Sequence, residues 1–273
     1  MSSEGPPAGN QTILKFIHVT DPHLVRRGEH VHGLDPGARL ERCIAEINDR
    51  HEDAAFCAIT GDLVHNGDDD GYSELARLLE QLRVPARLLL GNHDHREGFA
   101  RALADAPRDS QGFVQSVLTC PGYRFLFLDT HDEGSKAGRY CARRLDWLNE
   151  QLAAAADRDV FLFMHHPPFR VGIPNLDRIG LVDVDDFVST IDRYHNVRHI
   201  FFGHAHRPIS GHWRKISFST LFATNHQLAL DLTLVEQPRY THEGPAYGIV
   251  LVDAERIVIH SQHLFGDPAP GER

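Results

Sequence analysis

Short apolar runs that end in a polar residue recur along this chain and predict its strands. The run from Ala54 to Thr60 passes through Gly61 to Asp62. An apolar run of this length fits a buried strand, and the glycine lets the backbone turn sharply as it leaves the sheet. Four further runs share the pattern and predict strands at residues 13–20, 87–90, 160–164 and 197–202.

Apolar residues at helical spacing separate these strands. Leu40, Ile44 and Ile47 predict a helix from Pro36 to about residue 49, with Asp35 as its cap. Further helices are predicted at residues 72–82, 97–104, 143–156 and 185–194. The remaining predicted strands are a hairpin of residues 113–118 and 123–128 and three strands at residues 213–218, 248–252 and 257–263.

Strands that alternate with helices, twice over, predict an α/β fold built from parallel βαβ units. The hairpin and the C-terminal strands suggest a second, mixed sheet. A chain of 273 residues is long enough for one large α/β domain or two small ones, and it contains no segment that reads as an interdomain linker. We therefore expect one domain over residues 12–265, with disordered tails at residues 1–11 and 266–273.

Charge and composition argue against some classes of binding partner. The formal charge of -10 argues against a nucleic-acid polymer or a membrane surface, because both attract an excess of Lys and Arg. No apolar run approaches the length of about 20 residues that spans a bilayer, and no signal peptide precedes the first strand. The four cysteines form no C-x-x-C pair, so reduced thiols and a cytoplasmic location are expected.

The residues that follow the strands are carboxylates, amides and imidazoles. Asp62 is expected at the carboxyl end of its strand, where open α/β sheets place their ligands. A set of this kind on one sheet edge is what a pair of divalent metal ions needs. Asp68-Asp69-Asp70 could form a further metal site, but a solvated turn and helix cap is the preferred interpretation. Of the 20 histidines, most are expected at surface or loop positions, for example His30, His32, His51, His195 and His212.

Five motifs give this set its order. They are Asp21-x-His23, Gly61-Asp62, Gly91-Asn92-His93-Asp94, His165-His166-Pro167-Pro168 and Gly203-His204-Ala205-His206. In order and spacing they resemble the motifs of the calcineurin-like metallophosphoesterases and span most of the chain. Residues 169–181 and 225–231 are similar to class III cyclic-nucleotide phosphodiesterases and bacterial glycerophosphodiesterases.

The resemblance implies a four-layer α/β/β/α sandwich of two mixed β-sheets, with two metal ions at the strand ends. It implies that Asp62 bridges both ions. The remaining ligands would be Asp21, His23 and His206 for the first ion and Asn92, His165 and His204 for the second. Imidazole ligands favour Fe, Mn, Zn or Co over Mg or Ca.

The resemblance also implies roles beyond metal binding. His93 resembles the family's catalytic histidine, which binds the substrate and gives a proton or hydrogen bond to it. His226 would contact the substrate or support the ligands. His166 is expected to pack in the interior or to hold a metal-binding residue in place. Surface ion pairs are expected for Arg26, Arg27 and Arg178, although these residues could instead contact phosphate.

The sequence therefore predicts a binuclear metal-dependent phosphodiesterase, in which a metal-bridging hydroxide attacks small-molecule diesters such as 3′,5′-cyclic nucleotides or glycerophosphodiesters. A homo-oligomer, formed through residues 169–181, is a further expectation. A phosphomonoesterase or protein phosphatase of the same fold is the nearest alternative, and a scaffold without metals is the alternative from another class. A nuclease is disfavoured because the chain has no basic stripe.

Overall fold

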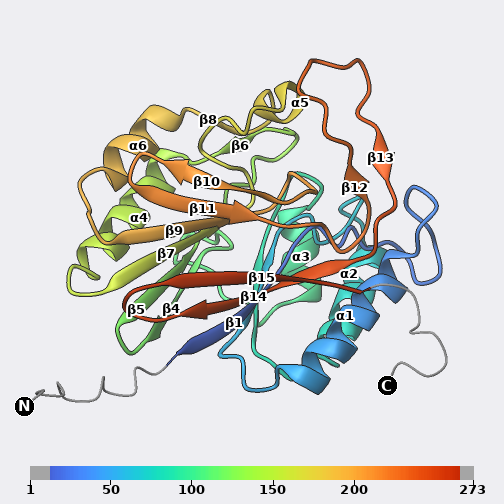
Figure 1. Cartoon of the computed structure of the whole chain (residues 1–273). Coiled ribbons are helices and arrows are strands. Elements are labelled where there is room, and N and C mark those ends of the chain that lie inside the picture. Colours follow the sequence, from blue (N-terminus) through green and yellow to red (C-terminus); the bar gives the residue numbers. More distant parts are fainter. Residues whose placement is uncertain (1–12, 265–273) are drawn as a thin grey trace, which may run out of the picture.

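The computed structural model describes residues 13–264, so both predicted tails and the outermost domain residues lie outside the described part. Two β-sheets lie face to face at the centre, and helices cover the outer face of each (Figure 1). The predicted α/β class and layered sandwich are confirmed. No helix within residues 13–264 is long and apolar enough to cross a membrane.

The first sheet has the strand order β15-β14-β1-β2-β3. Strand β1 pairs in parallel with β2, β2 pairs in parallel with β3, and β14 runs antiparallel to both β1 and β15. The strands are β1 Leu14–Val19, β2 Cys57–Thr60, β3 Ala86–Leu89, β14 Ala246–Val252 and β15 Ile257–His263.

The second sheet has the order β10-β11-β9-β7-β5-β4. Its central strands β5, β7, β9 and β11 are parallel to one another, while β4 and β10 are antiparallel edge strands. The strands are β4 Ser116–Cys120, β5 Tyr123–Phe127, β7 Asp159–Met164, β9 Val197–Phe202, β10 Ile209–Trp213 and β11 Ile216–Thr220. Two small ladders stand apart: β6 Gly138–Arg139 with β8 Leu181–Val182, and β12 Gln227–Leu228 with β13 Tyr240–Thr241.

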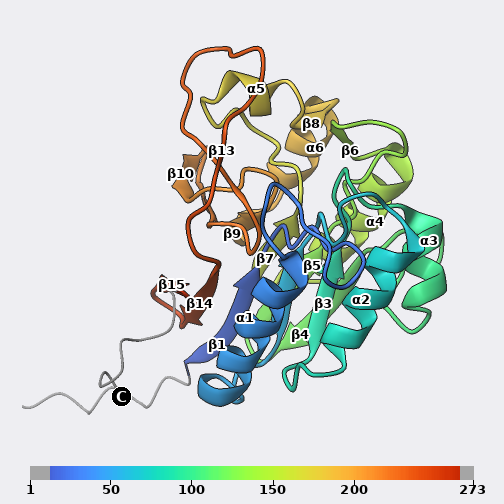
Figure 2. The ribbon, with the colours of Figure 1, turned by 90° about the vertical axis from the view of Figure 1, so that its right-hand side faces the viewer.

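Helices cover the outer face of each sheet (Figure 2). Three pack on the first sheet: α1 Pro36–Arg50, α2 Asp69–Leu79 and α3 Arg96–Ala102. Two pack on the second: α4 Ala142–Ala153 and α6 Val184–Ile191, and the short α5 Pro174–Asp177 lies beyond the strand ends. As predicted, Asp35 caps α1, because its carboxylate accepts from the backbone N–H of Ala38 at 3.0 Å.

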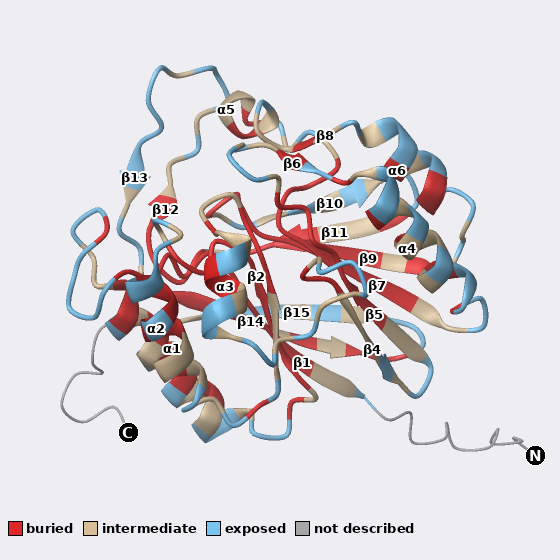
Figure 3. Ribbon diagram, turned by 180° about the vertical axis from the view of Figure 1, so that it is seen from behind, coloured by how far each residue is buried: buried red, intermediate tan, exposed pale blue. Residues whose placement is uncertain are grey.

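Aromatic residues fill the space between the two sheets. Phe16 stacks on Phe56 with ring centroids 4.7 Å apart, and Phe163 stacks on Phe201 at 4.8 Å. All four side chains are fully buried, and the central strands β7 and β9 are buried over most of their length (Figure 3). Burial of this much aromatic surface stabilises the sandwich and fixes the two sets of strand ends relative to each other.

Two sequence predictions about the C-terminal third are wrong. The strands at 248–252 and 257–263 join the first sheet rather than the second. Strand β14 is buried on both faces, since Val250 packs between the sheets and Tyr247 packs under the helices, and this needs a place beside β1. The predicted strand at 213–218 is instead a hairpin, because Arg214 takes a φ of 56° and turns β10 into β11.

The predicted helices are present, with ends that differ by up to three residues. A difference of three residues occurs at the start of α2, which begins at Asp69 rather than at Tyr72, because Asp68 caps it by accepting from the N–H of Gly71 at 2.8 Å. This supports the cap interpretation of Asp68-Asp69-Asp70. All four cysteines are unpaired, as expected for reduced thiols.

Candidate metal centre

The loops that follow β1, β2, β3, β7 and β9 meet at one end of the sandwich. Hydrogen bonds between side chains and the main chain hold these loops together across the two sheets. Nδ1 of His165 donates to the carbonyl of Thr60 at 2.7 Å, and the N–H of His204 donates to Oδ1 of Asp21 at 3.1 Å. The predicted ligands from both sheets are therefore brought to one place.

The four predicted ligands of the first ion surround a common point. Nε2 of His23 lies 3.0 Å from Nε2 of His206 and 3.5 Å from Oδ2 of Asp62. Nε2 of His206 lies 3.4 Å from Oδ1 of Asp21. All four side chains are buried. Around a tetrahedral ion with bonds of about 2.0–2.1 Å, ligand atoms stand about 3.3 Å apart, so these separations fit a bound cation.

The remaining predicted ligands have unsatisfied atoms. Among the described residues, Oδ1 of Asn92, Nε2 of His165 and Nε2 of His204 are buried without a hydrogen-bond partner. A buried polar atom without a partner costs about 1–3 kcal/mol, and a cation would satisfy all three. Oδ1 of Asp62 lies 3.4 Å from Nε2 of His165, while its Oδ2 faces His23. The two oxygens of Asp62 therefore face the two ligand sets.

Backbone carbonyls set the imidazole tautomers. Nδ1 of His206 donates to the carbonyl of His226 at 2.8 Å, as Nδ1 of His165 does to Thr60. A carbonyl can only accept, so each Nδ1 carries a proton and each neutral ring keeps its lone pair on Nε2. Partners of this kind orient imidazole ligands in metal sites.

Burial and the Asp62 carboxylate shift the pKa of two ligand imidazoles in opposite directions. Burial lowers the pKa of His204 to about 3, and the nearby His165 adds to this shift. Burial also acts to lower the pKa of His165, but the Asp62 carboxylate outweighs it and raises that pKa to about 9. Burial opposes the charge of Asp62, yet His165 and His23 hold the pKa of this carboxyl well below its usual range. A cation bound at Nε2 of His165 would compete with a proton at that atom.

The backbone at the centre is strained. Left-handed φ angles between 48° and 68° occur at five predicted ligands, which are Asp21, His23, Asp62, His204 and His206. Such angles cost about 1–3 kcal/mol at a residue other than glycine and are found at functional sites. Gly91 matters in a different way, since a Cβ there would stand 2.2 Å from Oδ1 of Asp62.

A cavity of about 330 Å³ opens beside these ligands. His93 and His226, the two predicted substrate contacts, both line it. His32 contributes as well, and so do four residues at or near α5: Ile173, Asn175, Leu176 and Ile179. A third wall, which the sequence did not predict, is the arm of residues 228–240. The arm rises beside α5 (Figures 1 and 2), where Asn175 hydrogen bonds both the N–H and the carbonyl of Val235.

Comparison with known proteins identifies the family. The model of the calcineurin-like phosphoesterase family matches residues 14–208. The chain belongs to this family. It is a hydrolase, and its family uses divalent metal ions.

Individual relatives agree with the family assignment of this phosphoesterase. A Rhodopseudomonas palustris protein named "Probable cyclic nucleotide phosphodiesterase" is 44% identical over 250 residues, which cover 90% of this chain and 91% of the relative. An Arcobacter nitrofigilis protein named "Probable glycerophosphodiester phosphodiesterase" is 27% identical over 93% of this chain and 95% of its own. A dimetal phosphatase from Danio rerio has the same fold, with a TM-score of 0.68 at 15% identity over 92% and 96% of the two chains.

The structure also places the other residues of the phosphoesterase that were singled out from the sequence. His166 is buried, and its Nδ1 lies 2.9 Å from Oγ1 of Thr130. Arg26 pairs with Asp70 at the surface, at 3.0 Å, and neither Arg27 nor Arg178 is among the described residues that line the cavity. His32 is exposed as expected but stands at the cavity rim, where its ring stacks on Tyr240 at 3.8 Å.

Two residues near the centre were assigned no role from sequence. Asp94 is buried and accepts from the N–H groups of Gly91, Leu63 and Val64 at 2.8–3.2 Å, so it ties the loop after β2 to the loop after β3. His65 contacts both His23 and His93. Asp94 closes a motif that was recognised, whereas His65 has only its position three residues after Asp62 to mark it.

Proposed function

We propose that this phosphoesterase is a binuclear metal-dependent phosphodiesterase that hydrolyses small-molecule phosphodiesters. The observation that carries the proposal is the position of Asp62, whose two carboxylate oxygens face two separate ligand sets at 3.4–3.5 Å. The relatives named as cyclic nucleotide and glycerophosphodiester phosphodiesterases support 3′,5′-cyclic nucleotides or glycerophosphodiesters as substrates.

Asp21, His23, Asp62 and His206 would hold one ion, and Asp62, Asn92, His165 and His204 the other. Bound Fe, Mn, Zn or Co ions would neutralise phosphate charge and lower the pKa of water. This matters in a chain with a formal charge of -10, because the protein alone would repel a phosphate.

His93 is the proposed proton donor. Its Nδ1 donates to the carbonyl of His65 at 2.8 Å, so Nε2 is the nitrogen left to exchange a proton with the substrate. In hydrolysis, water adds to phosphorus and loses a proton while one P–O ester bond breaks. The leaving oxygen takes a proton from Nε2 of His93, and the proton lost by the water replaces it. The backbone N–H of His93 is held by Asp62, which keeps this ring beside the reacting phosphate.

The cavity supplies room for the second ester group. Apolar side chains line part of it, with Ile173, Leu176 and Ile179 from the segment around α5 and Leu228 and Val235 from the arm. A phosphomonoester has one ester group and no second one to place there. The homo-oligomer expected through residues 169–181 stays a prediction, and in the structure several of these residues face the cavity.

A substrate panel tests the proposal. The protein is stripped with a chelator, reloaded with Mn, Co, Zn or Fe, and given cyclic nucleotides, glycerophosphodiesters and the matching monoesters. We expect the stripped protein to be inactive and two ions per chain to restore cleavage of a diester. Full activity with one ion per chain, or cleavage of monoesters alone, would contradict it.

A further inference from the structure

His65 occupies a fixed place between two residues of the proposed site. A parallel bridge pairs Leu24 with Val64, and the N–H of His65 donates to the carbonyl of Leu24 at 2.8 Å. The N–H of His23 donates to the carbonyl of Asp62 at 2.9 Å in the same ladder. The loops after β1 and β2 are therefore joined residue by residue, and this ladder puts the ring of His65 against that of His23.

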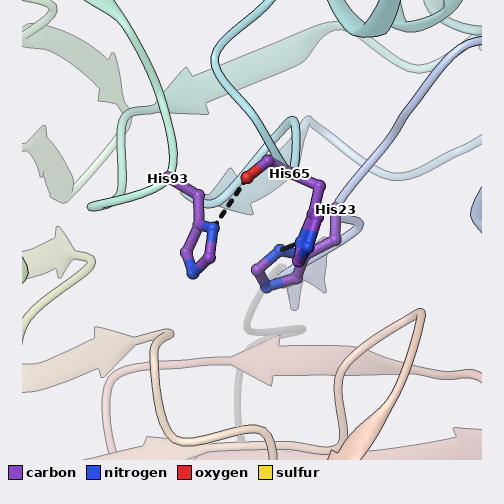
Figure 4. A group of neighbouring side chains, drawn as sticks. All are labelled: His23, His65 and His93. Atoms are coloured by element: carbon purple, nitrogen blue, oxygen red, sulfur yellow. Dashed lines mark hydrogen bonds between the residues drawn. The ribbon is translucent and has the colours of Figure 1, made fainter. Parts of the chain in front are cut away.

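His65 uses a different atom for each neighbour (Figure 4). Its ring Nδ1 lies 3.2 Å from Nδ1 of His23, and its backbone carbonyl accepts from Nδ1 of His93 at 2.8 Å. The rings of His65 and His93 also stack, with centroids 5.1 Å apart and an angle of 19° between the planes. The stacking on His93 and the contact with His23 both need the ring of His65, but of the two hydrogen bonds only the one with His23 depends on the side chain at position 65.

The direction of the ring contact follows from the surroundings of His23. Nε2 of His23 faces Nε2 of His206 and Oδ2 of Asp62 at 3.0 and 3.5 Å, so this is the atom that would bind a cation through its lone pair. A neutral imidazole then carries its proton on Nδ1. Nδ1 of His65 must accept that proton, which places the proton of His65 on its own Nε2.

We propose that His65 is a positioning residue, whose ring accepts the Nδ1 proton of His23 and so directs the Nε2 lone pair of His23 at the first metal ion. This rests on the proposed metal role of His23. Removing a partner that orients a metal-binding imidazole typically weakens metal affinity by about 10–100-fold. A hydrogen-bond acceptor at the position of Nδ1 is what the role requires.

Three substitutions separate this role from simple packing. His65→Leu keeps the bulk and removes the acceptor. His65→Asn places an amide oxygen near the position of Nδ1, whereas His65→Gln places it about one bond further out. Metal affinity is measured for each by competition with a chelator, and the ions per chain are counted. His32→Leu is the matched control, since His32 lies at the same cavity rim and stacks on Tyr240 rather than on a predicted ligand.

We expect His65→Leu and His65→Gln to bind one of the two ions about 10–100-fold more weakly. The metal affinity of His65→Asn should stay within about threefold of that of the parent. The metal affinity of His32→Leu should equal that of the parent. With saturating metal, turnover of His65→Leu should fall far less than that of His93→Ala, because the carbonyl that holds His93 remains.

Parent-like metal affinity in His65→Leu would overturn the proposal. Equal losses in His65→Asn and His65→Leu would overturn it too, because His65 would then act as packing or as a ligand itself. His23→Ala distinguishes a failure of the proposed metal centre from a failure of the proposed role of His65. If His23→Ala retains both ions, the proposed metal centre fails. If it loses one while His65→Leu loses none, only the role of His65 fails.

Discussion

The backbone N–H of His93 donates to Oδ1 of Asp62 at 2.9 Å. The candidate proton donor and the candidate bridging carboxylate are thus tied by the main chain, independently of the His93 ring. Replacing the ring leaves this hydrogen bond in place, whereas replacing Asp62 removes it. The two residues can therefore be tested separately.

Asp62→Ala should lose at least one metal ion per chain and nearly all activity. The substitution removes the carboxylate whose two oxygens face Nε2 of His165 and Nε2 of His23. Elemental analysis of the purified variant checks this. Two tightly bound ions in an active Asp62→Ala protein would show that the bridging role is wrong.

His93→Ala should keep both ions and lose about 10²–10⁴-fold in turnover, the range typical of a lost general acid or base. No predicted metal ligand depends on the ring of His93 for its hydrogen bond, so the metal content should match that of the parent. Turnover is compared at saturating substrate with the metal content measured on the same sample. A loss of less than about threefold would reduce His93 to a structural residue.

Gly91→Ala should disrupt the centre from the backbone. The added methyl would stand 2.2 Å from Oδ1 of Asp62 and 2.7 Å from the ring of His165, so both side chains would have to move. We expect lost metal and lost activity in a folded protein. Gly180→Ala is the control, because its added methyl would stand no closer than 3.4 Å to any neighbour. Equal metal content in the two variants would contradict this reading of Gly91.

His199 gives a pH dependence of stability away from the metal centre. Its ring lies between Ser217 and Ser219, at 2.7 and 2.8 Å, and burial lowers its pKa from 6.5 to about 3. Below pH 6.5 the unfolded chain takes up a proton that the folded chain does not. The folded protein therefore loses stability as the pH falls from about 6.5 toward 3.

His199→Gln removes this proton uptake. The variant should be less stable than the parent at pH 8, and the gap should narrow by up to about 2 kcal/mol at pH 5, since 1.5 pH units correspond to about 2 kcal/mol. Urea unfolding of both proteins at the two pH values measures the gap. A gap in unfolding free energy that does not change with pH would contradict this, because His199 would then take up a proton as readily in the folded as in the unfolded chain.

Much of the fold could be predicted because its signals are local. The run from Ala54 to Thr60 and the spacing of Leu40, Ile44 and Ile47 follow from burial on one sheet and one helix face. The partner of a strand is a non-local property, which is why β14 was placed in the wrong sheet. The turn at Arg214 was missed because nothing in its identity requires a positive φ.

The candidate site likewise has parts that local sequence signals predict and parts that depend on tertiary packing. Its predicted ligands follow strand ends, and parallel strands bring such ends together. Neither the contact of His65 with His23 nor the arm that Asn175 holds over the cavity could be predicted, because both join loops whose paths depend on tertiary packing.

The substrate preference depends on the cavity walls. A monoester carries nearly two negative charges near neutral pH and a diester carries one, so a cationic centre alone would favour the monoester. A diesterase must gain its preference from contacts with the second ester group. His226 lies on the cavity wall, and its carbonyl, which accepts from His206, stays in place when the ring is removed. His226→Ala should therefore weaken diester cleavage more than monoester cleavage.

The most direct test is the ratio of kcat/KM for an aryl phosphodiester and the matching aryl monoester, measured on protein loaded with Mn or Co. The proposed function predicts a higher kcat/KM for the diester. A preference of tenfold or more for the monoester would contradict it and favour a phosphomonoesterase.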